Sequence, residues 1–113
     1  MTRRRACLAL LLTVVCALAV PAGAAEAQRS WRAEKCFRYG RDWNEALRRF
    51  GRAGLSPPFV GGVVAFIGSD CASLDKICPL TAKDREFVDI LAIRVVNGGM
   101  STTFLPFGCP HSP

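Results

Sequence analysis

The sequence predicts an all-α protein: a small three-helix domain with a C-terminal tail stapled by two disulfides. Residues 30–53 and 81–96 repeat their apolar side chains every three or four positions, which is the period of an amphipathic helix. Between them, an apolar segment follows a Ser-Pro-Pro sequence that can open a helix. Four cysteines follow residue 27, and an even number predicts two disulfides in an exported chain.

Residues 1–27 are predicted to be a cleaved secretory signal peptide. Three arginines at 3–5 precede an apolar stretch at 6–20, and Ala-x-Ala triplets at 22–24 and 25–27 offer cleavage sites. A retained signal anchor is the alternative, but this stretch has 15 residues, and a bilayer span needs roughly 20. We therefore expect cleavage and export.

Residues 28–113 are expected to form a single disulfide-stabilised helical domain of 86 residues, secreted or periplasmic, without a transmembrane span. The domain carries twelve basic and eight acidic residues, and residues 28–54 alone have a net charge of +5. The basic surface therefore belongs to the first helix and the turn after it.

The first helix is expected over residues 30–53, with Gly54 as its stop. On its exposed side Glu34, Arg38 and Asp42 follow one another at spacing four, which predicts a ladder of ion pairs. Trp31, at the start, is expected to be exposed. The core stripe is predicted to be Cys36, Tyr39, Trp43, Leu47 and Phe50.

Residues 59–68 contain only apolar residues and glycine, and follow Ser56-Pro57-Pro58. We favour a buried helix, in which Gly61, Ala65 and Gly68 form a small-residue edge that a neighbouring backbone approaches closely. The valines and isoleucine in this segment also suit a strand, so periodicity leaves both structures open.

The third helix is expected to begin at Thr81, with Asp84 completing a capping box, and to run to about Val96. The tail at 100–113 is expected to return to the bundle and to be pinned by Cys109. The core stripe of this helix is predicted to be Phe87, Val88, Leu91, Ala92 and Val95, widened by Ile90, Ile93 and Val96.

The cysteines of the expected domain are Cys36, Cys71, Cys78 and Cys109, and four cysteines permit three pairings. We expect Cys71 to pair with Cys78, which closes a short loop, and Cys36 with Cys109, which ties the tail to the first helix. The spacing contains no Cys-x-x-Cys pair, so a zinc site is not expected.

The sequence contains no complete catalytic set. It lacks a Gly-x-Ser-x-Gly elbow, a His-Glu-x-x-His motif and a phosphate-binding glycine loop. We therefore expect no catalytic residue, metal or cofactor. The alternative is a small secreted hydrolase that uses the loop carboxylates of Asp70 and Asp75 or the only histidine, His111.

Arg48 and Arg52 are the candidate binding residues, because Arg38, Arg41 and Arg49 have acidic neighbours on the same helix. Guanidinium groups offer fixed forks of donors to phosphate and carboxylate. We expect an acidic protein or an anionic envelope component as partner, and no nucleic acid, which is scarce outside the cytosol. A second alternative is therefore a cationic envelope-surface binding protein.

Four landmarks occur in a recognisable order: Cys36 early in a helix, the Gly-rich apolar segment 59–63, Cys-Pro-x-Thr at 78–81, and Pro-Phe-Gly-Cys at 106–109. This layout resembles that of the type VI secretion amidase-immunity family, small periplasmic helical proteins that neutralise a cell-wall-cutting toxin. The signal peptide, the even cysteine count and the missing catalytic set favour an exported, non-enzymatic binding protein, most consistent with a bacterial periplasm, and this is the leading expectation. The resemblance implies that such a protein is of the inhibitor or immunity type.

Overall fold

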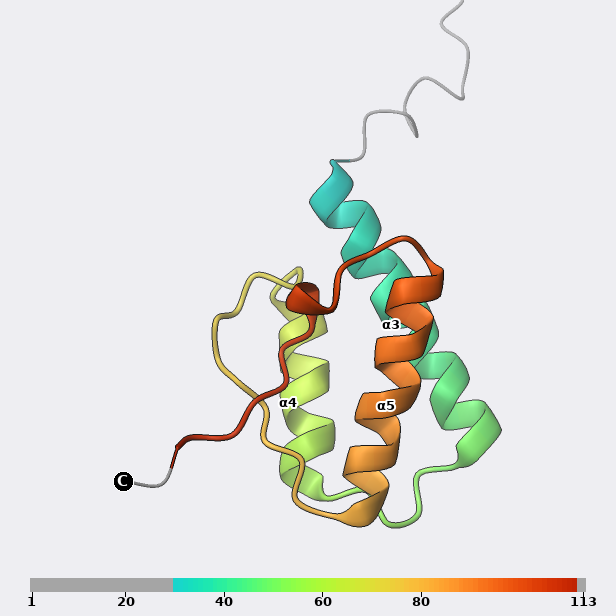
Figure 1. Ribbon diagram of the computed structural model, residues 1–113, viewed down its shortest axis with the longest axis vertical. Helices are drawn as coiled ribbons and strands as arrows, with labels where there is room; N and C mark the ends of the chain where they lie inside the picture. The colour runs from blue at the N-terminus through green and yellow to red at the C-terminus, as the bar shows by residue number, and fades with distance from the viewer. Residues whose placement is uncertain (1–29, 112–113) are drawn as a thin grey trace, which may run out of the picture.

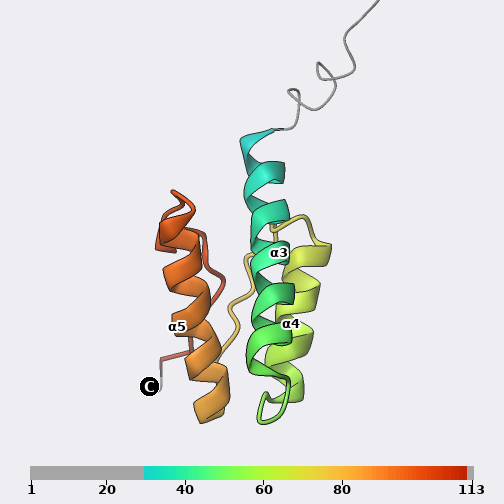
Figure 2. The ribbon, with the colours of Figure 1, turned by 90° about the vertical axis from the view of Figure 1, so that its right-hand side faces the viewer.

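The computed structural model describes residues 30–111, in which three α-helices pack as a bundle (Figures 1 and 2). The predicted three-helix fold is confirmed, and the segment at 59–68 is helical. The signal peptide expected at 1–27 lies outside the described residues. The elements are α3 (Trp31–Phe50), α4 (Pro57–Gly68), α5 (Ala82–Asn97) and a short 3-10 turn, η1 (Thr102–Phe104).

Helix α3 is shorter than expected. It begins because the Ser30 side chain accepts a hydrogen bond from the backbone N–H of Ala33 at 3.1 Å. It ends at Phe50 rather than Ala53, because Gly51 adopts a φ of 74°, which glycine tolerates without strain, and donates to the Leu47 carbonyl. The chain then turns back into α4.

The core stripe of α3 is rotated relative to the prediction. Tyr39 and Trp43 are buried as expected, but Phe50 is 43% exposed, and Asp42 and Ala46 are buried instead. The reason is visible in Figure 2, where α3 lies between α4 and α5 and must cover both. The prediction that Asp42 faces solvent was wrong.

Helix α4 is only half buried. Phe59, Val63 and Phe66 face the core, whereas the three small residues that we expected to meet a neighbouring backbone, Gly61, Ala65 and Gly68, are exposed. The close approach occurs at Gly62, where an added Cβ would lie 2.9 Å from the Ile77 side chain. The small-residue edge was therefore placed on the wrong face.

Helix α5 starts with the predicted capping box between Thr81 and Asp84. Phe87, Leu91 and Val95 are fully buried. The expected widening of the core stripe is confirmed at Ile90, which packs against the core, and was wrong at Ile93 and Val96, which are 62% and 54% exposed. An outer helix of a three-helix bundle buries one face only.

The tail returns to the bundle as predicted. Phe104 in η1 packs edge-on against Tyr39 with ring centroids 5.9 Å apart, and Phe107 stacks on Phe59 at 5.6 Å. These contacts hold the tail at residues 104–107 beside α4 (Figure 1). The core cluster consists of Tyr39, Trp43, Ala46, Phe59, Val63, Phe66, Ile77, Phe87, Leu91, Val95 and Met100.

Residues 30–111 contain two disulfides, but the expected pairing was wrong. Cys36 is bonded to Cys71, and Cys78 to Cys109. Because α4 runs antiparallel to α3, Cys71, which follows the end of α4, lies beside Cys36 in the first half of α3. The prediction of a short Cys71–Cys78 loop ignored this antiparallel path.

The second bridge follows from a short pairing between the loop and the tail. Ile77 forms a parallel β-bridge with Phe107, in which the Ile77 N–H donates to Pro106 O at 2.8 Å and the Gly108 N–H donates to Ile77 O at 3.1 Å. Cys78 and Cys109 are thereby brought side by side. The two disulfides span 35 and 31 residues, so each restricts the unfolded chain by a similar amount, about 4 kcal/mol in the chain-entropy model.

Within residues 30–111 we find no helix that combines the length and the apolar character needed to cross a membrane.

Candidate functional site: the groove between α3 and α5

A hollow of about 720 Å³ lies along the seam between α3 and α5. It extends from Glu34 to Phe50, which is about 24 Å along a helix at 1.5 Å per residue. We call it the α3–α5 groove. No residue of α4 lines it; its lining is Glu34, Arg38, Arg41, Asp42, Phe50, Ile90, Ile93, Arg94, Asn97, Gly98 and Met100.

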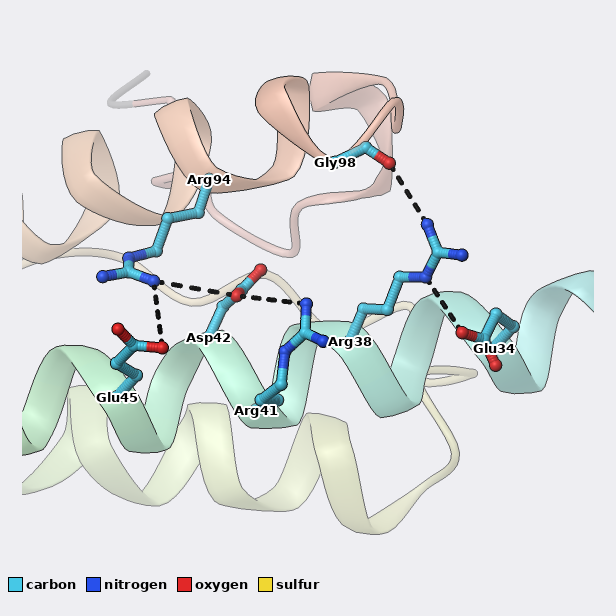
Figure 3. A network of polar contacts seen from close by, with 7 residues as sticks. All are labelled: Glu34, Arg38, Arg41, Asp42, Glu45, Arg94 and Gly98. Atoms are coloured by element: carbon cyan, nitrogen blue, oxygen red, sulfur yellow. Dashed lines mark hydrogen bonds and ion pairs between the residues drawn. The ribbon is translucent and has the colours of Figure 1, made fainter.

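An ion-pair network crosses the groove from α5 to α3 (Figure 3). The Arg94 guanidinium on α5 lies 3.8 Å from the Asp42 carboxylate and 3.6 Å from that of Glu45, both on α3. Arg41 approaches Asp42 at 3.9 Å from the same helix. The charged residues that we expected to form an exposed ladder on α3 therefore serve partly to join two helices.

Arg38 closes one end of the groove. Its Nε donates to Glu34 at 2.9 Å, which confirms the predicted spacing-four pair, and its Nη1 donates to the carbonyl of Gly98 at 3.3 Å. The second contact ties the first turns of α3 to the end of α5. The groove thus has a defined end, held by the Glu34 and Arg38 side chains of α3 and by the Gly98 carbonyl just after α5 (Figure 3).

The Asp42 carboxylate is the unusual group of the groove. Its side chain is only 10% exposed and its partners within residues 30–111 are the ion pairs to Arg41 and Arg94, but its oxygens are not among the fully buried atoms that lack a partner, so solvent still reaches them. Its contacts to Arg41 and Arg94, at 3.9 and 3.8 Å, are ion pairs that are too long for hydrogen bonds. Burial raises the pKa of Asp42, and the charges of Arg41 and Arg94 offset only part of this effect.

A second buried carboxylate, that of Asp84, has its acceptor sites occupied. It receives hydrogen bonds from the Ser56 N–H at 2.9 Å, the Ser56 hydroxyl at 2.6 Å, and the N–H groups of Leu80 and Thr81 at 2.9 and 3.1 Å. Burial alone would raise the pKa of Asp84, but these hydrogen bonds outweigh it and lower the pKa to about 2. Asp84 therefore fastens the starts of α4 and α5 together and is not available to a ligand.

The structure separates the two predicted binding residues. Arg48 lines a different hollow, of about 400 Å³, on the outer side of α3 together with Phe37 and Asn44. Arg52 is exposed in the turn after α3 and lines neither of these hollows. Arg41, whose charge we expected to be satisfied by a neighbour, has a side chain that is 61% exposed and lines both hollows.

The hydrolase candidates are not brought together. Asp75 lines two hollows beside the 69–80 loop, whereas Asp70 and His111 line neither. Asp70 occupies a left-handed turn at the end of α4, with a φ of 61°, which is a common role for aspartate. Residues 30–111 contain no group of three or more side chains placed to hold a metal ion.

Sequence reasoning missed Asp42, Arg94 and Ile93 as groove residues. One signal was present: Asp42 lies three residues after Tyr39 and next to Trp43, within the arc of α3 that carries the core stripe. The position of α5, which brings Arg94 over Asp42, leaves no such signal in the local sequence.

Comparison of the chain with protein-family models, with curated proteins and with solved structures finds no match. The geometry of the groove is therefore what bears on function.

Proposed function

We propose that the protein is an exported, non-enzymatic binding domain of the inhibitor or immunity type, whose α3–α5 groove binds an extended segment of a partner protein. The observation that carries this proposal is the Asp42 carboxylate, which is buried in the groove, ion-paired and without a hydrogen-bond donor from the described residues.

An extended polypeptide supplies what the groove lacks. Its backbone N–H groups donate to carboxylates, and its carbonyls accept from guanidinium groups such as that of Arg41, which is largely exposed. Apolar side chains of such a segment would pack on Ile90, Ile93 and Met100, which line the same groove. On binding, the Asp42 carboxylate exchanges water for the N–H donors of the segment and forms charge-assisted hydrogen bonds, which are stronger than neutral ones.

The two disulfides support the exported part of the proposal. Disulfides persist in oxidising compartments and are rare in the cytosol, and the leader-like sequence at 1–27 gives the route. Expression of the whole chain followed by intact-mass analysis tests this part. The expected mass corresponds to a chain trimmed near residue 27 and four hydrogens lighter than the reduced form; an untrimmed or fully reduced product contradicts it.

Site-specific photo-cross-linking tests the groove. A photoreactive residue replaces Ile93, which lines the groove, or Val96, which does not, and both are exposed on α5. In an envelope extract we expect one protein to be cross-linked from position 93 and none from position 96. The cross-links from position 93 are expected to fall within a single extended segment of that partner protein. The Asp42→Asn variant is expected to reduce this product at least tenfold.

Equal cross-linking from both positions, or none from position 93, contradicts a groove-binding function. The hydrolase alternative makes a different prediction: Asp75→Ala or His111→Ala would abolish a hydrolytic activity without lowering the melting temperature. If the partner is an enzyme, we expect its activity to fall on binding.

A further inference from the structure

Helix α4 has a solvent face without any polar side chain. Its twelve residues, Pro57–Gly68, consist only of proline, glycine, alanine, valine, isoleucine and phenylalanine. A surface helix in water normally carries charged residues on its outer side. The outer side of α4 is instead formed by the exposed residues Pro57, Pro58, Gly61, Val64, Ala65 and Gly68.

The apolar face continues beyond α4 on both sides. On the α3 side, Phe37 is 56% exposed and shares a hollow with Gly40 and Ile67. On the other side, Leu80 is 58% exposed and shares a hollow of about 330 Å³ with Pro58 and Ala65 of α4. We call the outer residues of α4, together with Phe37 and Leu80, the α4 face. Contiguous exposed apolar surface of this kind marks an interaction site more often than isolated apolar residues do.

The α3 border of this face is cationic. Phe37, Arg41, Asn44 and Arg48 are separated by four, three and four positions, so they form one stripe along α3. All of them line the hollow next to α4, and no carboxylate lines it. On the other border Asp75 and Lys76 have opposite charges.

The acidic residues of α3 lie on a different side of the helix. Glu34 and Asp42 line the α3–α5 groove, and Glu45 pairs with Arg94 of α5. Arg48 forms no ion pair within residues 30–111, and Arg41 has only the long contact to Asp42. The charge on the α4 side of α3 is therefore positive and largely unopposed.

We propose that the α4 face, with Arg41 and Arg48 at its edge, docks the protein on an anionic lipid bilayer, with α4 parallel to the membrane plane. An apolar helix face bordered by arginines is the arrangement of interfacial membrane binding: apolar side chains enter the headgroup boundary while guanidinium groups bind lipid phosphates. The unopposed positive charge selects an anionic surface. No α4 residue lines the α3–α5 groove, and of the two arginines only Arg41 borders both surfaces; membrane docking through the α4 face and Arg48 therefore does not depend on the proposed function.

Vesicle co-sedimentation of the oxidised protein isolated after export tests the inference. Vesicles contain either phosphatidylcholine alone or phosphatidylcholine with about 30% phosphatidylglycerol, at low and at high salt. We expect binding to the anionic vesicles that falls steeply with salt, and at least tenfold weaker binding to the neutral ones.

Two valines of equal exposure provide a matched pair of variants. Val64 on the α4 face and Val96 on α5 are both 54% exposed. Val64→Glu is expected to weaken binding to anionic vesicles at least tenfold, whereas Val96→Glu changes it about twofold, the effect of one added negative charge. Circular dichroism confirms that both variants remain folded.

Two neighbouring arginines test the cationic border. Arg48 lines the hollow beside α4, whereas Arg49 is exposed on α3 but does not line it. Arg48→Gln is expected to weaken binding about fivefold, since a basic residue at an anionic surface contributes about 1 kcal/mol, and Arg49→Gln is expected to have a smaller effect.

Binding that ignores lipid charge, an absence of binding, or equal effects of Val64→Glu and Val96→Glu would each overturn the inference. If vesicle binding is absent while cross-linking from position 93 persists, membrane docking fails and the groove function stands. If binding to anionic vesicles persists while cross-linking from position 93 is absent, the groove function fails and membrane docking stands.

Discussion

Two buried aspartates, Asp84 and Asp42, show how the same side chain serves different ends in two regions of this small domain. Asp84 is fully buried and accepts four hydrogen bonds, so its pKa falls to about 2 even though burial acts in the opposite direction. Asp42 is 7% exposed, accepts none from the described residues, and has a raised pKa because burial dominates over the nearby arginines.

The difference follows from where each residue lies along its helix. Asp84 is in the first turn of α5, where backbone N–H groups have no helical acceptor and are free to bond a side chain. Asp42 is in the middle of α3, where every N–H is already used by the helix. A buried carboxylate at a helix start therefore joins structural elements through backbone donors, whereas the mid-helix carboxylate of Asp42, whose oxygens still reach solvent, takes its hydrogen-bond donors from water or from another molecule.

The largest loss of stability is expected from removing the Asp84 carboxylate, which joins the starts of α4 and α5. Asp84→Ala leaves the Ser56 hydroxyl and three buried or partly buried N–H groups without their acceptor. We expect it to lower the free energy of unfolding by about 3–5 kcal/mol, because each hydrogen bond to a charged group contributes about 1.5–3 kcal/mol and the contributions are not additive. Chemical denaturation measures this loss.

Asp89→Ala is the control for this variant, since Asp89 is an exposed carboxylate on the same helix. We expect it to change the free energy of unfolding by less than about 0.5 kcal/mol. A similar loss in both variants would show that charge on α5, and not the hydrogen-bonded cluster, stabilises the fold.

A smaller loss of folding stability is expected when the pH is lowered. Because the pKa of Asp84 is about 2 in the folded protein, against an ordinary value of 3.8 for a solvated aspartate, the unfolded chain binds the proton first as the pH falls. The stabilisation is complete above about pH 5 and is lost as the pH falls toward 2, with a total of about 2 kcal/mol. We expect the difference in unfolding free energy between the wild type and Asp84→Asn to narrow by this amount over that range; a constant difference contradicts the assignment.

The same comparison shows what the sequence could predict. The capping box places Thr81 and Asp84 three residues apart, so local spacing was sufficient to find that part of the Asp84 cluster. The bonds to Ser56 join positions 28 residues apart, and no local pattern encodes them. The helices and their starts were therefore predictable, because they depend on residues within one or two turns.

Asp42 and the disulfides show the limit of local spacing. A carboxylate at spacing four from Arg38 fits an exposed ladder as well as the edge of a buried stripe, and only the position of α5 decides between them. The pairing of Cys36 with Cys71 likewise depends on the antiparallel path of α3 and α4, which the sequence spacing does not specify. The prediction of Arg48 and Arg52 as binding residues counted charges along one helix, whereas the α3–α5 groove is formed by two helices, so it could not indicate the groove.

The hydroxyl of Tyr39 is a third buried polar group, and unlike the two aspartates it is neutral. Tyr39 is fully buried, and its Oη has no hydrogen-bond partner among residues 30–111, so burial raises the pKa of the phenol above its ordinary value. We expect Tyr39→Phe to raise the free energy of unfolding by about 1 kcal/mol, because it removes an unsatisfied buried polar atom and keeps the ring packing against Phe66 and Phe104. A loss of stability on thermal melting would show that the hydroxyl has a partner.

The smallest effect on stability is expected at Asp42, where it separates fold from function. Because the folded protein raises the pKa of this carboxylate, the ionised form is disfavoured by folding, and the associated stabilisation is lost as the pH rises through the folded pKa. Asp42→Asn keeps the shape and removes a charge that burial disfavours, so we expect the free energy of unfolding at pH 7 not to fall. The partner segment, in contrast, should bind at least tenfold more weakly, since a charge-assisted hydrogen bond is replaced by a neutral one. Unfolding titrations and binding isotherms on the same two proteins measure both quantities. If stability falls by several kcal/mol, as at Asp84, Asp42 is a second fastening and the groove loses its ligand-accepting group.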